Sequence, residues 1–212
     1  MPAPSPLPAG QATISFAVVL AGQPLPDAFQ VASLLVEQTL DRPSSARIAI
    51  AVTPETLSGF TSSAEFGMGR ALEIGAGYDQ QTSPIFTGRV ATVWISSAEN
   101  ASSPVMTIDA LGLDAGPPAS KKRAPVLVLT YLADVLGFNL EGDGHARGTA
   151  RVSGFVRFPG SSLAHPGDTL TLAGFGARFD GHAFVRAVRH ELAGGNWTTT
   201  AALGPAVNPA TD

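Results

Sequence analysis

The sequence predicts a mainly β protein, made of two barrels or sandwiches joined by a short helical connection. Apolar and polar residues alternate almost without pause from Gln11 onward, which is the period of strands that bury one face. Turn-forming residues, such as Gly194-Gly195-Asn196, separate these runs at short intervals. Strand and helix patterns do not alternate along the chain, so a parallel α/β sheet is not expected.

A first β-rich domain is expected over residues 11–116, after a proline-rich arm at residues 1–10 that should be extended and flexible. Alternation predicts its strands at residues 12–22, 29–41, 45–53, 70–79, 85–97 and 104–115. Turns are expected at Asp41-Arg42-Pro43 and over residues 80–84, and a loop over residues 55–69. The Gly116-Pro117-Pro118 run marks the end of this domain.

Residues 117–150 are expected to be a linker that contains the one credible helix. Over residues 124–140, four apolar residues recur at helical spacing, namely Leu127, Tyr131, Leu132 and Val135. Gly137 is suited to the C-cap, although the β-branched valines in this stretch have a low helix propensity.

A second β domain is expected over residues 151–204, followed by a flexible tail at residues 205–212. Its strands are predicted at residues 151–160, 168–176, 182–192 and 196–204. Asp180-Gly181 and Gly194-Gly195-Asn196 are predicted to be hairpin turns, because both contain residues that tolerate a positive φ.

The composition restricts the possible partners. Only 14% of the 212 residues are charged, against about a quarter in an average domain, which suggests a surface that faces other protein. A net charge of −4 argues against nucleic acid, and the one basic run, Lys121-Lys122-Arg123, is typical of a solvated linker. The chain has no cysteine, no signal-peptide pattern and no membrane-spanning stretch, so synthesis and folding in the cytoplasm are expected.

The histidines do not suggest a metal or cofactor site. His182 and His190 are expected on the same face of one strand but about 26 Å apart, too far to share one ion. His145 and His165 lie in glycine- and proline-rich stretches without metal-ligand spacing. We therefore expect no metal and no cofactor.

The remaining polar and aromatic candidates favour structural roles. Asp168 follows a Pro-Gly turn and is expected to open a strand, and Asp180 is needed by its own turn. Glu73 and Asp109 each stand alone in a strand. The Gly-x-Gly of "GFGARF" lacks the third glycine and the helix of a phosphate loop, and no Gly-x-Ser-x-Gly elbow occurs. Trp94 and Trp197 could stack on a sugar, but aromatic residues in strands more often belong to a core or an interface. No catalytic residue is expected.

Several motifs carry a resemblance to a known family. Pro166-Gly167 precedes a strand, a Gly-x-x-x-x-Phe-Asp-Gly run follows at residues 174–181, and Val-x-His stands at residues 188–190. A glycine turn then leads to an aromatic-x-Thr strand at residues 197–199. Together with the "RALEIGAGYDQQTSPIFTGRV" hairpin, this pattern resembles the hub proteins of contractile injection machines. These include late control protein D of phage tails and the N-terminal part of the valine-glycine-repeat spike proteins of type VI secretion.

The resemblance covers roughly residues 11–204 and implies two tandem tube-like antiparallel β-barrels in a homotrimeric baseplate hub. Such a hub joins the inner tube to the central spike, which is expected to be a separate chain because no Val-Gly repeat follows Leu203. The particle could be a phage tail, a type VI system or a released injection device. An inner-tube or tube-adaptor protein, a carbohydrate-binding β-sandwich and a small cofactor-binding barrel enzyme are the alternatives.

Overall fold

In a computed structural model of the protein, nearly every described residue belongs to a strand or to a connection between strands. The structure describes residues 7, 12–53, 56, 66–97, 103–115, 125–142 and 152–205. The strands of the first half are β1 (Ile14–Leu20), β2 (Gln23–Pro24), β3 (Gln30–Thr39), β4 (Pro43–Ala51), β5 (Ala71–Tyr78), β6 (Gln81–Ser96) and β7 (Val105–Ala115). Those of the second half are β8 (Leu127–Thr130), β9 (Gly137–Gly142), β10 (Val152–Pro159), β11 (Thr169–Ala173), β12 (Gly181–Ala193) and β13 (Asn196–Leu203).

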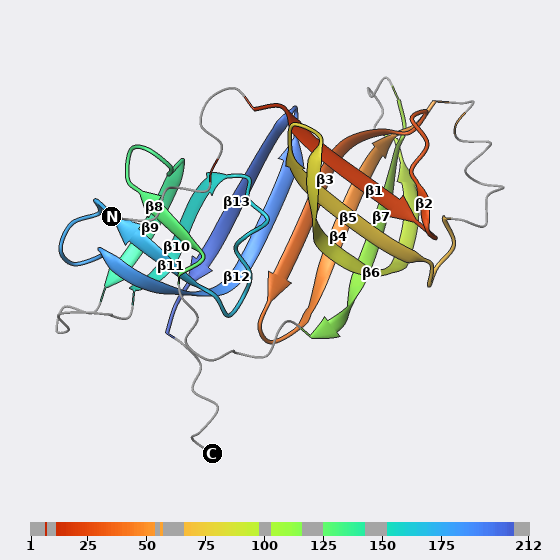
Figure 1. Ribbon diagram of the computed structural model, residues 1–212. Coiled ribbons are helices and arrows are strands. Elements are labelled where there is room, and N and C mark those ends of the chain that lie inside the picture. Colours follow the sequence, from red (N-terminus) through yellow and green to blue (C-terminus); the bar gives the residue numbers. More distant parts are fainter. Residues whose placement is uncertain are drawn as a thin grey trace, which may run out of the picture.

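The described strands form a single sheet that runs through both halves of the molecule (Figure 1). Its main path is β2-β1-β5-β6-β7-β4-β3-β12-β13-β10-β9, with β11 and β8 branching from β12. Neighbouring strands are antiparallel throughout, except for the parallel pair of β8 and β11. The mainly β, antiparallel class expected from the sequence is therefore confirmed.

The two expected barrels are not closed. The strand path begins at β2 and ends at β9, without a pairing that returns either end to the sheet among the described residues. Instead, β3 pairs with β12 over seven residues, from Ser33 opposite Ala193 to Thr39 opposite Ala187, and joins the halves into one continuous surface. Local alternation predicts strands but does not say which strands pair, so this junction was not foreseeable from the pattern.

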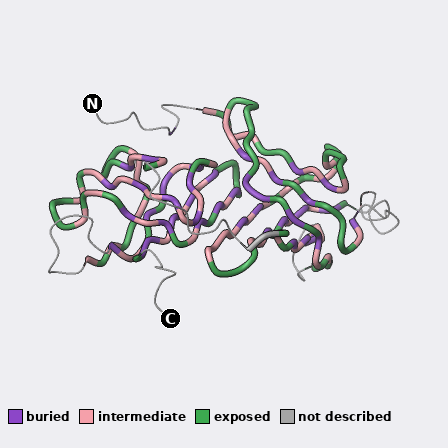
Figure 2. The backbone as a smooth tube through the Cα atoms, turned by 60° about the horizontal axis from the view of Figure 1, so that its bottom comes forward, coloured by how far each residue is buried: buried purple, intermediate pink, exposed green. Residues whose placement is uncertain are grey.

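Two buried clusters lie along this sheet, and Figure 2 shows buried and exposed residues alternating along its strands. The first cluster draws on β1 and β3–β7 and also includes Leu192 and Trp197 from the second half. The second draws on β8 and β10–β13. Leu7, the one described residue of the expected N-terminal arm, is also buried in the second cluster.

The helix expected over residues 124–140 is wrong for its described part, where β8 and β9 flank a turn. Leu127 and Leu129 are both buried, which is the period of a strand rather than of a helix. β8 pairs with β11, and β9 pairs with β10. Pairing with distant strands and the β-branched Val126 and Val128 thus outweigh the helical spacing of the leucines.

A bulge in β12 overturns the expected side-chain directions there. The pairing of β12 with β13 shifts between Val185 and Ala187, so Arg186 is an extra residue. Before the bulge Ala183 and Val185 are buried, and after it Val188, His190 and Leu192 are buried. His182 is exposed, so the prediction that His182 and His190 share a face is wrong.

The tight turns agree in part with the sequence. Gly194 and Gly195 connect β12 to β13 with φ values of 56° and 74°, which confirms a two-residue hairpin of the type that needs two positive φ angles. The turn expected over residues 80–84 is instead made by Asp79 and Gln80, both at positive φ, because β6 already begins at Gln81.

The expected tight turn at Asp180-Gly181 is also wrong in its details. β11 ends at Ala173 and β12 begins at Gly181, so residues 174–180 form a longer loop. Asp180 holds this loop together, because its Oδ1 accepts a 2.7 Å hydrogen bond from the Phe175 N–H. Gly181 has a φ of 129°, a positive value that glycine adopts more readily than other residues.

Substitution of Gly181 is expected to be costly while Asp180→Asn is nearly silent. Gly181→Val should lower the free energy of unfolding by about 1–3 kcal/mol, from backbone strain alone, because the space around the position is open. Asn at position 180 keeps an oxygen that accepts from Phe175. Urea unfolding of both variants measures this, and an Asp180→Asn loss as large as that of Gly181→Val would contradict it.

Candidate assembly surface

One side of the continuous sheet carries both buried clusters, and most side chains on the other side are partly or fully exposed. On β7, Ile108 and Ala110 are buried while the residue after them, Leu111, is 54% exposed. On β10, Val156 is buried while the preceding Phe155 is 41% exposed. We call this exposed side, across β6, β7, β4, β3, β12, β13 and β10, the open face.

Charged side chains on the open face form a row of ion pairs. At one end, Asp109 of β7 accepts from Arg47 of β4, with Nε–Oδ1 and Nη2–Oδ2 distances of 2.7 and 3.3 Å. Thr92 Oγ1 and Trp94 Nε1 of β6 also donate to Asp109, at 3.4 and 3.5 Å. This carboxylate therefore ties three strands together.

The row continues across the junction of the two halves. Arg189 of β12 contacts Glu37 of β3 at 3.5 Å and Glu191 of its own strand at 2.8 Å. Glu191 in turn accepts from Arg157 of β10 at 3.2 Å, and Arg157 also donates to Thr198 of β13 at 3.1 Å. Along this row each arginine lies between or beside acidic groups.

The main electrostatic effect of the row is neutralisation. The hydrogen bond from Arg47 holds the pKa of Asp109 below its usual value, and the same bond raises the pKa of Arg47. Both groups stay ionised near neutral pH. Exposed pairs of this kind contribute at most about 1 kcal/mol to stability, so their clearer consequence is that the charges of the row balance one another.

Large apolar side chains accompany these pairs. Trp94, Leu111, Leu113 and Phe155 are between 41% and 60% exposed. Aromatic residues and arginine are the side chains enriched at protein–protein contacts. The open face therefore has the composition of a surface that packs against other protein.

The histidine of the Val-x-His motif is structural. His190 is 1% exposed, and its Nδ1 lies 3.0 Å from Thr199 Oγ1, which also accepts from the Ser161 N–H at 3.0 Å. Burial, with a smaller contribution from His165, lowers the pKa of His190 to about 4. A neutral, buried imidazole at this position has no access to a substrate.

The structure does not bring the other polar candidates together as a catalytic group. His165 Nδ1 lies 3.5 Å from Asp168 Oδ2, and the same carboxylate oxygen accepts from the His165 N–H at 3.0 Å, which closes a turn. His182 Nδ1 contacts Thr171 Oγ1 at 3.1 Å on the surface. Glu73 is an exposed residue of β5. His145 and Lys121-Lys122-Arg123 lie outside the described residues.

Neither a metal cluster nor a membrane helix occurs in the part of the chain that the structure describes. No group of three or more potential metal-ligating residues is found there. No helix in those ranges is long and apolar enough to cross a membrane.

The two tryptophans differ in exposure. Trp197 is 4% exposed, which excludes it as a platform for a sugar, whereas Trp94 is 46% exposed. The sequence missed the charged row, because its residues lie on strands whose pairing is not visible locally. Glu37 and Arg189, for instance, are 152 residues apart. The only sequence signal was that these charged residues stand at the polar positions of strands in which apolar and polar residues alternate.

A protein-family model described as the Alg8 N-terminal domain matches residues 10–112 and 118–194. The chain belongs to this family. No curated protein matches the sequence.

Two solved structures share the fold of this Alg8 N-terminal domain family member. A tail protein from Neisseria meningitidis MC58 matches 91% of this chain and 96% of its own, at 9% identity and a TM-score of 0.61. The 43 kDa tail protein of prophage MuSo2 from Shewanella oneidensis matches 90% of this chain and 98% of its own, at 8% identity and a TM-score of 0.64. A type VI secretion component of E. coli, the c3393 protein, gives a weaker likeness, with 12% identity over 89% of this chain and 76% of its own at a TM-score of 0.47.

Proposed function

We propose that the protein is a structural, non-enzymatic subunit of a contractile, phage tail-like injection machine, and specifically its baseplate hub. In this role it joins the inner tube to the central spike and contacts other baseplate subunits. The observation that carries the proposal is the continuous sheet with one exposed, charge-paired face. The fold shared with two tail proteins over nine-tenths of the chain supports it.

The proposed assembly is a homotrimer that forms a ring. A sheet that extends through both halves of one chain presents the long, uninterrupted surface that the wall of a tube requires. The unpaired end strands of the sheet would be protected by neighbouring subunits, since exposed strand edges otherwise promote aggregation. The chain would be synthesised in the cytoplasm and then become part of an assembled particle. The division into domains at residues 11–116 and 151–204 remains part of this proposal.

Native mass spectrometry of the full chain is expected to give a species of three times the 21.7 kDa chain mass. A matched variant would reverse one charge of the row, Arg189→Glu, which places a third acidic group beside Glu37 and Glu191. We expect this variant to reduce trimer formation without loss of the monomer fold. A stable monomer at micromolar concentration, together with no trimer in the assembled particle, would contradict the proposal.

An inner-tube or tube-adaptor subunit is the second candidate, because the observations above fit either kind of tube wall. The number of rings in the particle separates a hub from an inner-tube subunit. Cryo-electron microscopy of assembled particles is expected to place a single ring of this protein between tube and spike. Many stacked copies along the tube would favour the inner-tube alternative.

A further inference from the structure

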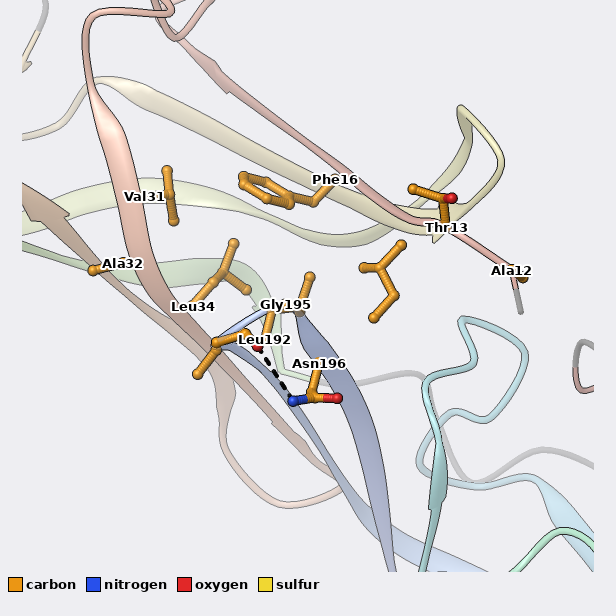
Figure 3. Close-up of a pocket in the computed structure, with 12 residues that line it drawn as sticks. Ala12, Thr13, Phe16, Val31, Ala32, Leu34, Leu192, Gly195 and Asn196 are labelled. Atoms are coloured by element: carbon orange, nitrogen blue, oxygen red, sulfur yellow. Dashed lines mark hydrogen bonds between the residues drawn. The ribbon is translucent and has the colours of Figure 1, made fainter. Parts of the chain in front are cut away.

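A groove separates β1 from β3 where the sheet of the first half curves round without closing. Its first part has a volume of about 370 Å³ and lies between the start of β1, the start of β3 and the β12–β13 hairpin (Figure 3). A second part, of about 460 Å³, continues the groove and is lined by β1, by β3 and by the segment that follows β2. The two parts share Phe16 and Val31, so they form one seam along β1.

Phe16 is the most unusual residue of this seam. It points to the same side of β1 as Val18 and Leu20, which are both buried in the first core cluster. Phe16 is nevertheless 46% exposed, and in Figure 3 its ring lies in the groove on the side of Val31. An aromatic side chain on the core side of a strand, left half in solvent, lacks part of the packing that its neighbours have.

The backbone at the seam is also incomplete. β1 pairs with β5 along its whole length, but on its other edge β2 pairs only with Val19 and Leu20, and the Leu25 N–H donates to the Val18 carbonyl at 2.8 Å. On the far side of the seam, β12 pairs with β3 only from Ser33 onward, and the β3–β4 register shifts at Ala32. Within the described residues, the first part of β1 therefore presents a strand edge without a ladder partner. Such an edge is a template for another strand.

The chemistry of the lining restricts what can occupy the seam. Among the described residues, none that lines the first part is charged, and Asp27 is the only charged residue that lines the second. A charged occupant would lose its hydration there without gaining an opposite charge. A helix would bury the edge of β1 without satisfying its backbone groups, because a helix uses its own groups internally.

We propose that the seam binds an extended, uncharged strand of another protein, which pairs with the free edge of β1 and covers Phe16. Apolar side chains on alternate positions of that strand would lie over Phe16, Val31 and Leu34, and main-chain groups would continue the ladder. This inference goes beyond the proposed function and does not depend on it, because it concerns the groove between β1 and β3 and not the charged row of the open face.

The test uses the full chain and a defined probe, the acetylated and amidated peptide Thr-Val-Thr-Val-Thr-Val. Titration followed by amide NMR is expected to show saturable binding below about 1 mM, with the largest shifts at Ile14, Phe16 and Ala32. Phe16→Lys should weaken binding at least about tenfold. Met68→Lys, at a position that is 78% exposed and outside the seam, should leave the affinity unchanged within about twofold.

Four results would overturn the inference. Absence of saturable binding at 1 mM probe, or shifts centred on β9, would show that the seam is not the strand site. A peptide that is N-methylated on alternate residues lacks the N–H donors along one of its edges. If this peptide bound with the same affinity as the unmethylated probe, the seam would be an apolar patch and not a site of strand pairing. Loss of self-association in Phe16→Lys, with peptide binding retained, would show that a second copy covers the seam instead.

Discussion

Trp197→Ala is expected to lower the free energy of unfolding by about 3–5 kcal/mol, the range for removal of a buried aromatic side chain. The indole is 4% exposed and lies in the first core cluster, although β13 belongs to the second half. Its ring centroid is 5.3 Å from that of Tyr78 and 6.1 Å from that of His190. Removal would therefore leave a cavity where the two halves meet.

Gly160 shows how closely the site is packed. A side-chain carbon at this position would lie 1.9 Å from Trp197 Cδ2, and the carbonyl of Gly160 accepts a 3.0 Å hydrogen bond from the Tyr78 hydroxyl. The loop after β10 is thus held against the indole and cannot easily move to fill the space.

Two variants serve as controls for Trp197→Ala in urea unfolding. Trp94→Ala, at a position that is 46% exposed, should cost less than about 1 kcal/mol. Trp197→Phe should cost less than Trp197→Ala, because it keeps an aromatic ring in the core and because the buried indole Nε1 has no hydrogen-bond partner among the described residues. Equal effects of Trp94→Ala and Trp197→Ala would contradict the role assigned to Trp197.

Acidification is expected to destabilise the protein through His190. Its pKa in the folded protein is about 4, below the ordinary value of 6.5, so the unfolded chain binds the proton more tightly. The contribution is fully present above pH 6.5 and is lost as the pH falls toward 4. The loss amounts to about 2 kcal/mol between pH 7 and pH 5, and about 3 kcal/mol by pH 4.

His190→Gln removes this titration while keeping a polar group that can reach Thr199. Its free energy of unfolding should be lower than that of the parent at pH 7 but should fall less steeply with acidification. His182→Gln, at an exposed position of the same strand, should follow the parent curve. Parallel curves for the parent and His190→Gln between pH 7 and pH 4 would show that His190 does not govern the acid response.

The sequence was a good guide to most strands and a poor guide to how they are arranged. Alternation located β1, β3–β7 and β10–β13 within a few residues, because half-buried strands of an antiparallel sheet carry this period directly. It missed β8 and β9, where leucines fit a helix as well as a strand. Barrel closure was also mispredicted, since it depends on the curvature of the whole sheet rather than on any segment.

The candidate surface was still harder to foresee. The bulge at Arg186 changes which side of β12 each later residue faces, so His190 is in the core and Arg189 is on the open face. No local sequence pattern predicts a single inserted residue in a strand. Phe16, by contrast, follows the alternation of the strand predicted over residues 12–22, and the open seam between β1 and β3 leaves it exposed.

The pairing of β3 with β12 has a consequence for the order of events during synthesis. Glu37 and Arg189 are 152 residues apart, so at about 5–20 residues per second a ribosome finishes β12 roughly 8–30 seconds after β3. During that interval the nascent N-terminal half has no partner for this edge of β3, while the rest of its own sheet can already form. Contacts between such distant residues also slow folding. The emerging chain is therefore expected to depend on chaperone protection of β3 until its C-terminal strands leave the ribosome.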